Sequence, residues 1–210
     1  MGAEPVYYGR FDDDNGQVMD RYEDIPARWR KPGGFTVDEF FELEDLPPHT
    51  ELIDGELVFV AAQRMFHMAV LRCVERALLD SVPKHLEVIR EMNIVIGTRQ
   101  APEPDLSLVP VEAVGDWDTT RFPAEVVVLA VEVESPDSLK RDRIRKVRLY
   151  AEGGVQHYWR VERQDDRPVV HVYELDPVAR AYVLTGVHHE RLKVSVPYDI
   201  DIDLTQLARI

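Results

Sequence analysis

The feature that most constrains the fold is an apolar run at residues 125–135, EVVVLAVEVES, which is interrupted by two glutamates, Glu132 and Glu134. A run of this length, rich in β-branched residues, is typical of a strand buried on both faces near the centre of a sheet. Residues two apart on a strand leave the same face, so the two glutamates share one. Because a buried carboxylate must be paired with a cation, the run predicts a central strand whose charge needs a partner.

Two local motifs in the first part of the chain predict a helix start and a hairpin. TVDE has the capping-box pattern, in which the Thr36 hydroxyl caps a helix and Glu39 reaches back to its first backbone N–H. In HTELIDGELVFV the pair Asp54-Gly55 separates two short apolar runs, and Asp-Gly favours a two-residue hairpin turn. The turn places Glu56 at the start of the second strand.

The remaining periodicity predicts two longer helices and several strands. Apolar residues recur at three- and four-residue steps from about residue 64 to residue 82, which indicates an amphipathic helix ended by Pro83. Residues 135–154 predict a second helix, with Pro136 near its first turn and Gly153-Gly154 as its stop. Strands are expected at residues 86–97, 105–110, 155–162, 168–175, 181–189 and 191–196. Together these elements predict an α+β fold, with a mixed sheet centred on residues 125–135 and helices on its faces.

The length of 210 residues suits one substantial domain. Residues 1–34 carry DDDNG, RYEDIP and RKPGG without a steady apolar period, so we expect an N-terminal extension. The domain is expected to occupy residues 35–210.

Composition excludes several classes of protein. No stretch approaches the length of a membrane helix and no signal peptide is recognisable, so a cytoplasmic protein that does not enter a membrane is expected. Cys73 is the only cysteine, which excludes a disulfide framework and a CxxC metal site. A formal net charge of −14 opposes tight, nonspecific binding to nucleic acid, although a local basic patch remains compatible with it.

Further charged residues are expected near the central strand. Asp105 opens the strand before it, and Glu56 opens another. Asp142 and Lys146 are four residues apart and share one face of the following helix, which would bring Lys146 back over Glu132. Two readings follow: Glu132 and Glu134 form salt bridges with nearby Arg or Lys, or Asp105 and Glu132 bind a divalent cation, a hard ion that prefers oxygen ligands.

These residues in this order resemble the PD-(D/E)XK nuclease superfamily, and in particular its bacterial Uma-two branch of restriction-endonuclease-like proteins. The segments that carry the resemblance are Pro104-Asp105, VEVESPDS (131–138), RDRIRKVRLY (141–150), GVQHYWRV (154–161), ELIDGELV (51–58) and His67. They cover roughly residues 36–205. The resemblance implies a restriction-endonuclease-like mixed β-sheet flanked by helices.

The resemblance also implies a set of catalytic residues. Asp105 and Glu132 match the acidic metal ligands of the motif, and Glu56 matches the additional acidic residue from the first helix or strand. The motif lysine should stand at residue 134, where this chain has Glu134. Members of this branch commonly carry the lysine on the following helix instead, which matches Lys146.

The implied chemistry is hydrolysis of DNA phosphodiester bonds with Mg²⁺ or Mn²⁺. The ion, held by Asp105 and Glu132, would act as a Lewis acid and help to deprotonate a water, with Lys146 orienting that water or stabilising charge. Glu56 would hold the ion through water or bind a second one. His67, Glu134 and Asp142 are accessory candidates.

Other functions remain open at the level of sequence. Glu134 in place of lysine, together with the acidic charge, is also compatible with a binding or scaffold protein that keeps the nuclease fold without cleavage. A carboxylate pair could equally serve a hydrolase acting on another substrate, although no sugar or peptide pocket is identifiable. A homodimer is compatible with the sequence, which does not determine the oligomeric state, the substrate sequence or the number of metal ions.

Overall fold

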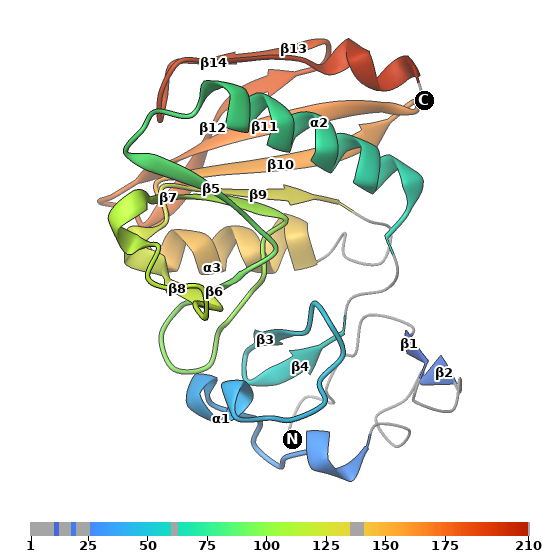
Figure 1. Cartoon of the computed structure of the whole chain (residues 1–210), viewed down its shortest axis with the longest axis vertical. Helices are drawn as coiled ribbons and strands as arrows, with labels where there is room; N and C mark the ends of the chain where they lie inside the picture. The colour runs from blue at the N-terminus through green and yellow to red at the C-terminus, as the bar shows by residue number, and fades with distance from the viewer. Residues whose placement is uncertain (1–10, 13–17, 20–25, 60–62, 135–140, 210) are drawn as a thin grey trace.

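The computed structural model describes residues 11–12, 18–19, 26–59, 63–134 and 141–209 (Figure 1). The expected position of Pro136 in the first turn of the second helix lies outside these residues, and so does the side chain of Asp142.

A six-stranded mixed sheet forms the centre of the molecule. Its strands, in spatial order, are β12 (Ala181–His188), β11 (Arg167–Asp176), β10 (His157–Gln164), β9 (Leu129–Val133), β7 (Leu106–Pro110) and β5 (Leu86–Arg90). β9 and β10 are parallel, and the other neighbours are antiparallel. The α+β class is confirmed, and so is the position of the apolar run: all five residues of β9 are buried and lie between β7 and β10.

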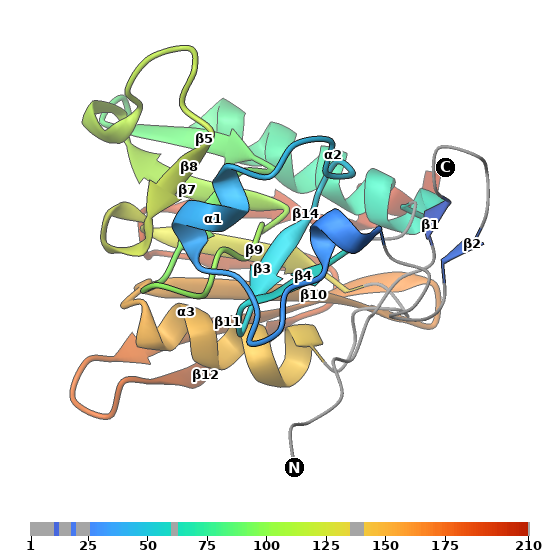
Figure 2. The ribbon, with the colours of Figure 1, turned by 90° about the horizontal axis from the view of Figure 1, so that it is seen from below.

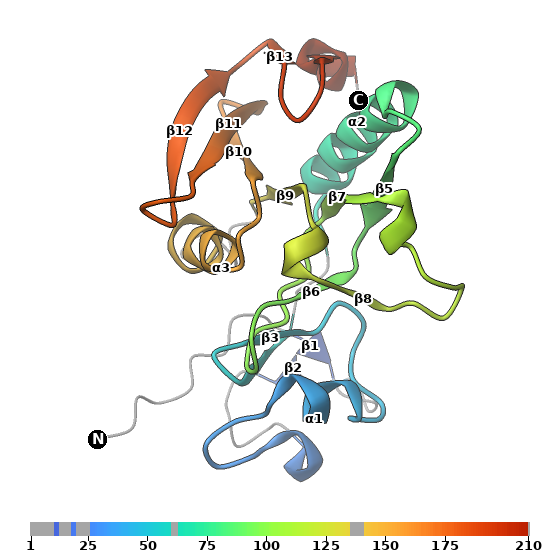
Figure 3. The same cartoon turned by 90° about the vertical axis from the view of Figure 1, so that its left-hand side faces the viewer.

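Helices cover both faces of this sheet, as Figure 3 shows. On one face α2 (Met65–Ser81) packs over a core that includes Val70, Leu106 and Val131. On the other face the helical segment η5 (Arg141–Lys146) continues into α3 (Val147–Glu152), which packs over a second core. The alternation of side chains along β9 explains the two cores, because Val131 faces α2 while Ala130 and Glu132 face α3.

The N-terminal part of the chain forms a smaller group of elements beside the sheet (Figure 1). It contains η2 (Ala27–Trp29), α1 (Val37–Phe41), β3 (Glu51–Ile53) and β4 (Glu56–Val58), and its buried side chains include Trp29 and Phe59. Ahead of it β1 (Phe11–Asp12) pairs with β2 (Val18–Met19). The capping box at Thr36 is present, and β3 and β4 form the expected hairpin.

A hairpin near the C-terminus packs beside α2. Its strands β13 (Arg191–Val194) and β14 (Ile200–Asp203) lead into η6 (Leu204–Arg209). Leu192 and Ile202 of this hairpin join the core under α2. Among the described residues, no helix is long and apolar enough to cross a membrane.

Two expected strands differ from the structure. Residues 86–97 form two strands rather than one, because Glu91 adopts a positive φ of 51° and the chain turns into β6 (Asn93–Val95), which pairs with β8 (Arg121–Pro123). The central strand begins at Leu129 rather than residue 125, because the 3-10 turn η4 (Ala124–Val126) precedes it. A second such turn, η3 (Val111–Ala113), follows β7.

Candidate active site

A buried lysine lies between two buried glutamates where η5 meets the sheet. Lys146 Nζ donates to both carboxylate oxygens of Glu132, at 2.8 and 2.9 Å, and lies 2.7 Å from Oε1 of Glu51. The three residues are between 0 and 3% exposed. Glu132 comes from the central strand β9, Lys146 from η5 and Glu51 from the β3–β4 hairpin, so three separate elements build this group.

Tyr150 completes the hydrogen bonding of Glu132. One helical turn beyond Lys146, its hydroxyl donates to Glu132 Oε1 at 2.7 Å. Burial, with the charges of Glu132 and Glu51, raises the pKa of Tyr150 well above its ordinary value, so the hydroxyl remains a donor. The helical spacing of four residues therefore places two donors on one carboxylate. Only the approach of Lys146 to Glu132 was expected from the sequence.

Asp105 lies beside Glu132 across the sheet. Leu106 pairs with Val131 in the antiparallel ladder of β7 and β9, so Asp105 and Glu132 occupy the next step. Asp105 Oδ2 accepts a hydrogen bond from Val133 N at 2.6 Å, where a backbone carbonyl would continue the ladder. The aspartate is therefore fixed at the strand end by the neighbouring strand itself.

His67 holds the other oxygen of Asp105. Its Nε2 lies 2.9 Å from Asp105 Oδ1, and both side chains are largely buried. A carboxylate only accepts hydrogen bonds, so Nε2 carries the proton. The Nδ1 atom is buried and has no hydrogen-bond partner among the described residues. The first turn of α2 thus positions Asp105. We call Lys146, Glu51, Glu132, Asp105 and His67 the acidic cluster.

Glu103 and His49 form a pair next to Glu51. The backbone N–H of Glu103 donates to Glu51 Oε1 at 2.9 Å, and the side chain of Glu103 lies 2.6 Å from His49 Nδ1. Burial raises the pKa of Glu103 to about 7, against the lowering effect of His49. Burial alone lowers the pKa of His49, but the hydrogen bond and charge of Glu103 outweigh it and leave the pKa raised. Each of the two groups therefore shifts the pKa of the other.

Glu134 pairs with a different cation, on the neighbouring strand β10. Its carboxylate pairs with Arg160 on β10, and both side chains are buried. Arg160 also lies 3.2 Å from Glu162, whose other oxygen lies 3.2 Å from His171 Nε2. At the position where the superfamily motif has a lysine, this chain therefore has one half of a buried ion pair.

Glu56 is not brought to the acidic cluster. It is partly exposed, and burial and the charge of Asp54 raise its pKa. Glu51, at the other end of the same hairpin, lies against Lys146 instead. The sequence contains a signal for Glu51, because it stands in an apolar strand, as Glu132 does, whereas the turn favours Glu56, the residue that follows it.

An arginine of η5 anchors the hairpin that carries Glu51. Arg145 Nε donates to Asp54 Oδ2 at 2.8 Å, and its Nη2 pairs with the other oxygen. This ion pair lowers the pKa of Asp54, mainly through the hydrogen bond from Arg145. Neighbouring residues of η5 thus serve two ends: Arg145 holds the hairpin and Lys146 joins the cluster.

Within the described part of the chain, no three His, Cys, Asp or Glu side chains gather in an arrangement ready for a metal ion. The geometry explains this, because Lys146 stands between Glu51 and Glu132 while His67 and Val133 hold Asp105. The cluster does place the oxygens of three acids on adjoining elements, and oxygen ligands are those that Mg²⁺ and Mn²⁺ prefer. By the chemistry of its donors, three carboxylates, the set fits such an ion.

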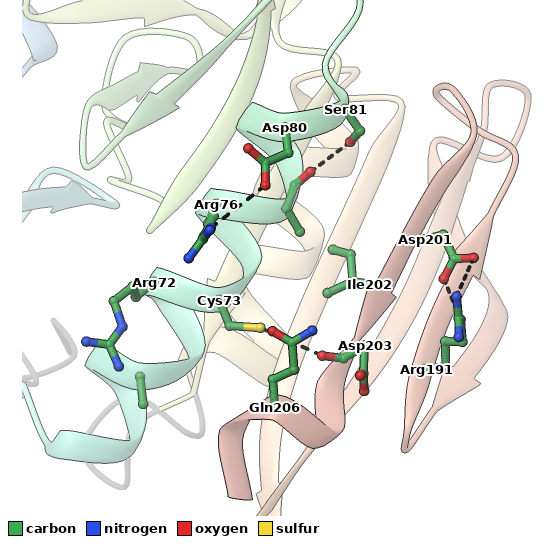
Figure 4. Close-up of a pocket in the computed structure, with 12 residues that line it drawn as sticks. Arg72, Cys73, Arg76, Asp80, Ser81, Arg191, Asp201, Ile202, Asp203 and Gln206 are labelled. Atoms are coloured by element: carbon green, nitrogen blue, oxygen red, sulfur yellow. Dashed lines mark hydrogen bonds and ion pairs between the residues drawn. The ribbon is translucent and has the colours of Figure 1, made fainter. Parts of the chain in front are cut away.

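A groove of about 800 Å³ lies elsewhere, between α2 and the C-terminal hairpin (Figure 4). Arg72 and Arg76 line it on the helix, and Arg191 pairs with Asp201 across the hairpin at 2.6 Å. Its lining residues carry both signs of charge and none belongs to the acidic cluster. The groove therefore adds nothing to the candidate active site.

Comparisons with known proteins bear on the family and the fold of the chain. The family model that matches the chain is Uma2, described as "Putative restriction endonuclease", and the match covers residues 37–206. A similar solved structure is that of "a putative nuclease belonging to DUF820" from Anabaena variabilis, with a TM-score of 0.60 at 19% identity; the match covers 78% of this chain and 89% of that one. At this identity the likeness shows the fold. No curated protein matches the chain.

Proposed function

The chain belongs to the Uma2 family, and on this premise we propose that it is an endonuclease that hydrolyses DNA phosphodiester bonds with the help of Mg²⁺ or Mn²⁺. Family membership and the nuclease-like fold support a nuclease function in general. DNA as the substrate and the dependence on a metal ion are the finer parts of the proposal.

One observation carries the proposal: two buried carboxylates, Glu51 and Glu132, converge on the ammonium of Lys146 beside Asp105. Buried ion pairs are a costly way to stabilise a fold, since apolar residues of similar volume often do as well or better. Clusters of interacting acids and a lysine are, in contrast, what a site for metal-assisted hydrolysis needs.

The metal ligands assigned by this proposal are Asp105, Glu132 and Glu51. Glu51 takes the role that the sequence suggested for Glu56, because it reaches the cluster and Glu56 does not. A bound Mg²⁺ or Mn²⁺ supplies Lewis acidity toward a phosphate oxygen and a water of lowered pKa. His67 positions Asp105, since it holds the Oδ1 atom at 2.9 Å.

Lys146 provides the positive charge that the motif lysine supplies in the superfamily. Its ammonium already lies against Glu132, so its tip reaches the space of the metal ligands. In that place it orients a water or stabilises the negative charge that develops on the phosphate. Tyr150, which donates to the same carboxylate, fixes the orientation of Glu132.

Calorimetric titration with Mn²⁺ tests the metal site. The wild type is expected to show saturable binding that Asp105→Asn and Glu132→Gln remove, while the matched variant Glu56→Gln binds as the wild type does. A folded wild-type protein that binds no Mn²⁺ contradicts the proposal.

Nicking of supercoiled plasmid then tests the activity. Nicking is expected from the wild type in Mg²⁺ or Mn²⁺ and is expected to be lost in Glu132→Gln and Lys146→Met. Nicking that survives in both variants would assign the activity to another site or to a contaminant.

A catalytically inactive binding or scaffold protein is the second candidate. The observation that favours it is the Glu134–Arg160 ion pair, which occupies the position of the motif lysine. A net charge of −14 also opposes binding to a polyanion at long range. Binding of Mn²⁺ without nicking under any of these conditions would support this candidate.

A further inference from the structure

The outermost strand of the sheet, β12, carries no charged side chain over most of its length. It is the terminal strand in the order of the sheet, paired with β11 on one side, and Figure 3 shows it at the margin of the molecule. Residues 181–187, AYVLTGV, contain no charged residue and no proline. Proteins commonly protect such edges with lysine, proline or very short strands, because an open edge pairs with other strands.

Three apolar side chains of β12 are also unusually exposed to solvent. Val183, Leu184 and Val187 are 54, 49 and 43% exposed. Every other large apolar residue of comparable exposure in the described part of the chain lies in a helix, a turn or a loop. The opposite edge strand, β5, differs, since it carries Glu87 and Arg90 within five residues.

Opposite charges stand at the two ends of this uncharged stretch. Arg180 precedes β12 and Glu190 follows it, and both are exposed. Neither has an ion-pair partner within the residues that the structure describes. A strand with opposite charges at its ends is complementary to a second copy of itself in the antiparallel direction, because each positive end then meets a negative one.

We propose that two copies of this chain pair antiparallel along β12 and join their six-stranded sheets about a twofold axis. The axis passes beside Thr185, the extra residue of a β-bulge in the pairing of β12 with β11. Val183 then lies opposite Val187 of the second copy, and Arg180 lies opposite Glu190 of the second copy. A twofold interface of this kind uses one surface patch twice and closes after two subunits.

The interface is independent of the proposed nuclease activity. β12 lies three strands from β9, which carries Glu132, so the acidic cluster remains outside the edge that pairs. Pairing of one short strand with its copy buries less surface than the roughly 1,600 Å² of a standard protein interface. We therefore expect a dimer that dissociates on dilution rather than a permanent one.

Light scattering coupled to gel filtration, over about 1 to 100 µM protein, measures the assembly directly. The wild type is expected to approach twice the chain mass of 24.2 kDa at the upper end. The double variant Val183→Lys, Val187→Lys sets lysine opposite lysine across the axis and is expected to raise the dissociation constant about 100-fold or more. Val178→Lys is the matched control, because Val178 is 93% exposed in the preceding hairpin turn, outside β12.

A charge-swap cycle tests the register. Arg180→Glu and Glu190→Arg are each expected to weaken the dimer about fivefold, and the double swap is expected to restore it. Circular dichroism checks that each variant is folded. A wild type that stays monomeric over the whole range overturns the proposal, and so does a dimer that persists in the double lysine variant. Single swaps without rescue by the double swap overturn the antiparallel register.

Discussion

The ammonium of Lys146 lies within 3 Å of both carboxylate oxygens of Glu132, and both residues are only 3% exposed. The contact joins η5 to the central strand β9 on one face of the sheet. It is therefore part of the fold as well as of the proposed site. Removing one member of a buried pair leaves the other as an isolated buried charge, which costs about 3–5 kcal/mol.

Lys146→Met is expected to lower the free energy of unfolding by about 3–5 kcal/mol at neutral pH, because Glu51 and Glu132 then lack the ammonium. Urea unfolding measures this, and Lys193→Met serves as an exposed control. Added Mn²⁺ is expected to recover part of the loss, since it supplies positive charge to the same carboxylates. A Lys146→Met protein as stable as the wild type would show that the contact contributes little.

Glu51→Gln and Glu56→Gln form a matched pair within one hairpin. We expect Glu51→Gln to weaken Mn²⁺ binding about tenfold or more, or about 1.4 kcal/mol, because Glu51 contacts Lys146 inside the cluster. Glu56→Gln is expected to leave Mn²⁺ binding within about twofold of wild type. Calorimetry measures both, and the opposite ranking would return the third acidic position to Glu56.

This ranking illustrates what the sequence could and could not predict about the site. The spacing of Lys146 from Tyr150 fixes them on one helix face, and both do reach Glu132. The choice between Glu51 and Glu56 depends on how the hairpin sits against η5. That placement comes from Arg145 and Asp54, two residues far apart in the sequence, and no local pattern reveals such a contact.

The fold, like the site, has features that local sequence signals predict and features that depend on contacts or backbone conformations without such a signal. The capping box at Thr36 and the Asp54-Gly55 turn are local signals, and both are confirmed. The division of residues 86–97 into two strands depends on the positive φ of Glu91. No turn-favouring residue at this point of the sequence predicts it. β14 was not predicted, because its burial depends on packing against α2, a contact between distant parts of the chain.

The raised pKa of Glu103 predicts how the stability of the folded protein depends on pH. Its pKa of about 7 lies above its ordinary value of 4.5, so the folded protein holds this proton more tightly than the unfolded chain does. The contribution is therefore fully present below about pH 4.5 and is lost as the pH rises to about 7. The raised pKa of His49 acts in the same direction above pH 6.5.

Glu103→Gln removes this titration while keeping the shape of the side chain. We expect the melting temperature of the wild type, measured relative to that of Glu103→Gln, to fall as the pH rises from about 4.5 to 7. Glu112→Gln, which changes an exposed glutamate, is the control. A constant difference across this range would contradict the raised pKa.

The Glu134–Arg160 pair makes a separate prediction. Arg160→Met leaves Glu134 buried without its guanidinium, so the free energy of unfolding is expected to fall by about 3–5 kcal/mol. Adding Glu134→Gln removes the buried carboxylate charge, and the double variant is expected to be more stable than Arg160→Met alone. Urea unfolding of the two single variants and the double variant tests this, and additive losses would show that the two residues do not interact.

Gly55 links the hairpin turn to the position of Glu51. Its φ of +83° favours glycine, and a Cβ atom there would lie 2.1 Å from Arg99 Nη2. Arg99 donates to the carbonyls of Gly33 and Asp54, at 2.7 and 3.0 Å, so the clash disturbs the contact that holds the turn. The side chain of Arg99 has to move or the hairpin has to shift.

Gly55→Ala is therefore expected to cost more stability than Gly97→Ala. Gly97 also has a positive φ, of +63°, but nothing lies within 4 Å of its added Cβ, so its cost is the backbone strain alone, about 1–2 kcal/mol. If the hairpin shifts, Glu51 moves with it, and Mn²⁺ binding weakens in Gly55→Ala while it stays unchanged in Gly97→Ala. Thermal unfolding and Mn²⁺ calorimetry on the two variants measure both effects, and equal losses in the pair would place the whole cost in φ rather than in the contact with Arg99.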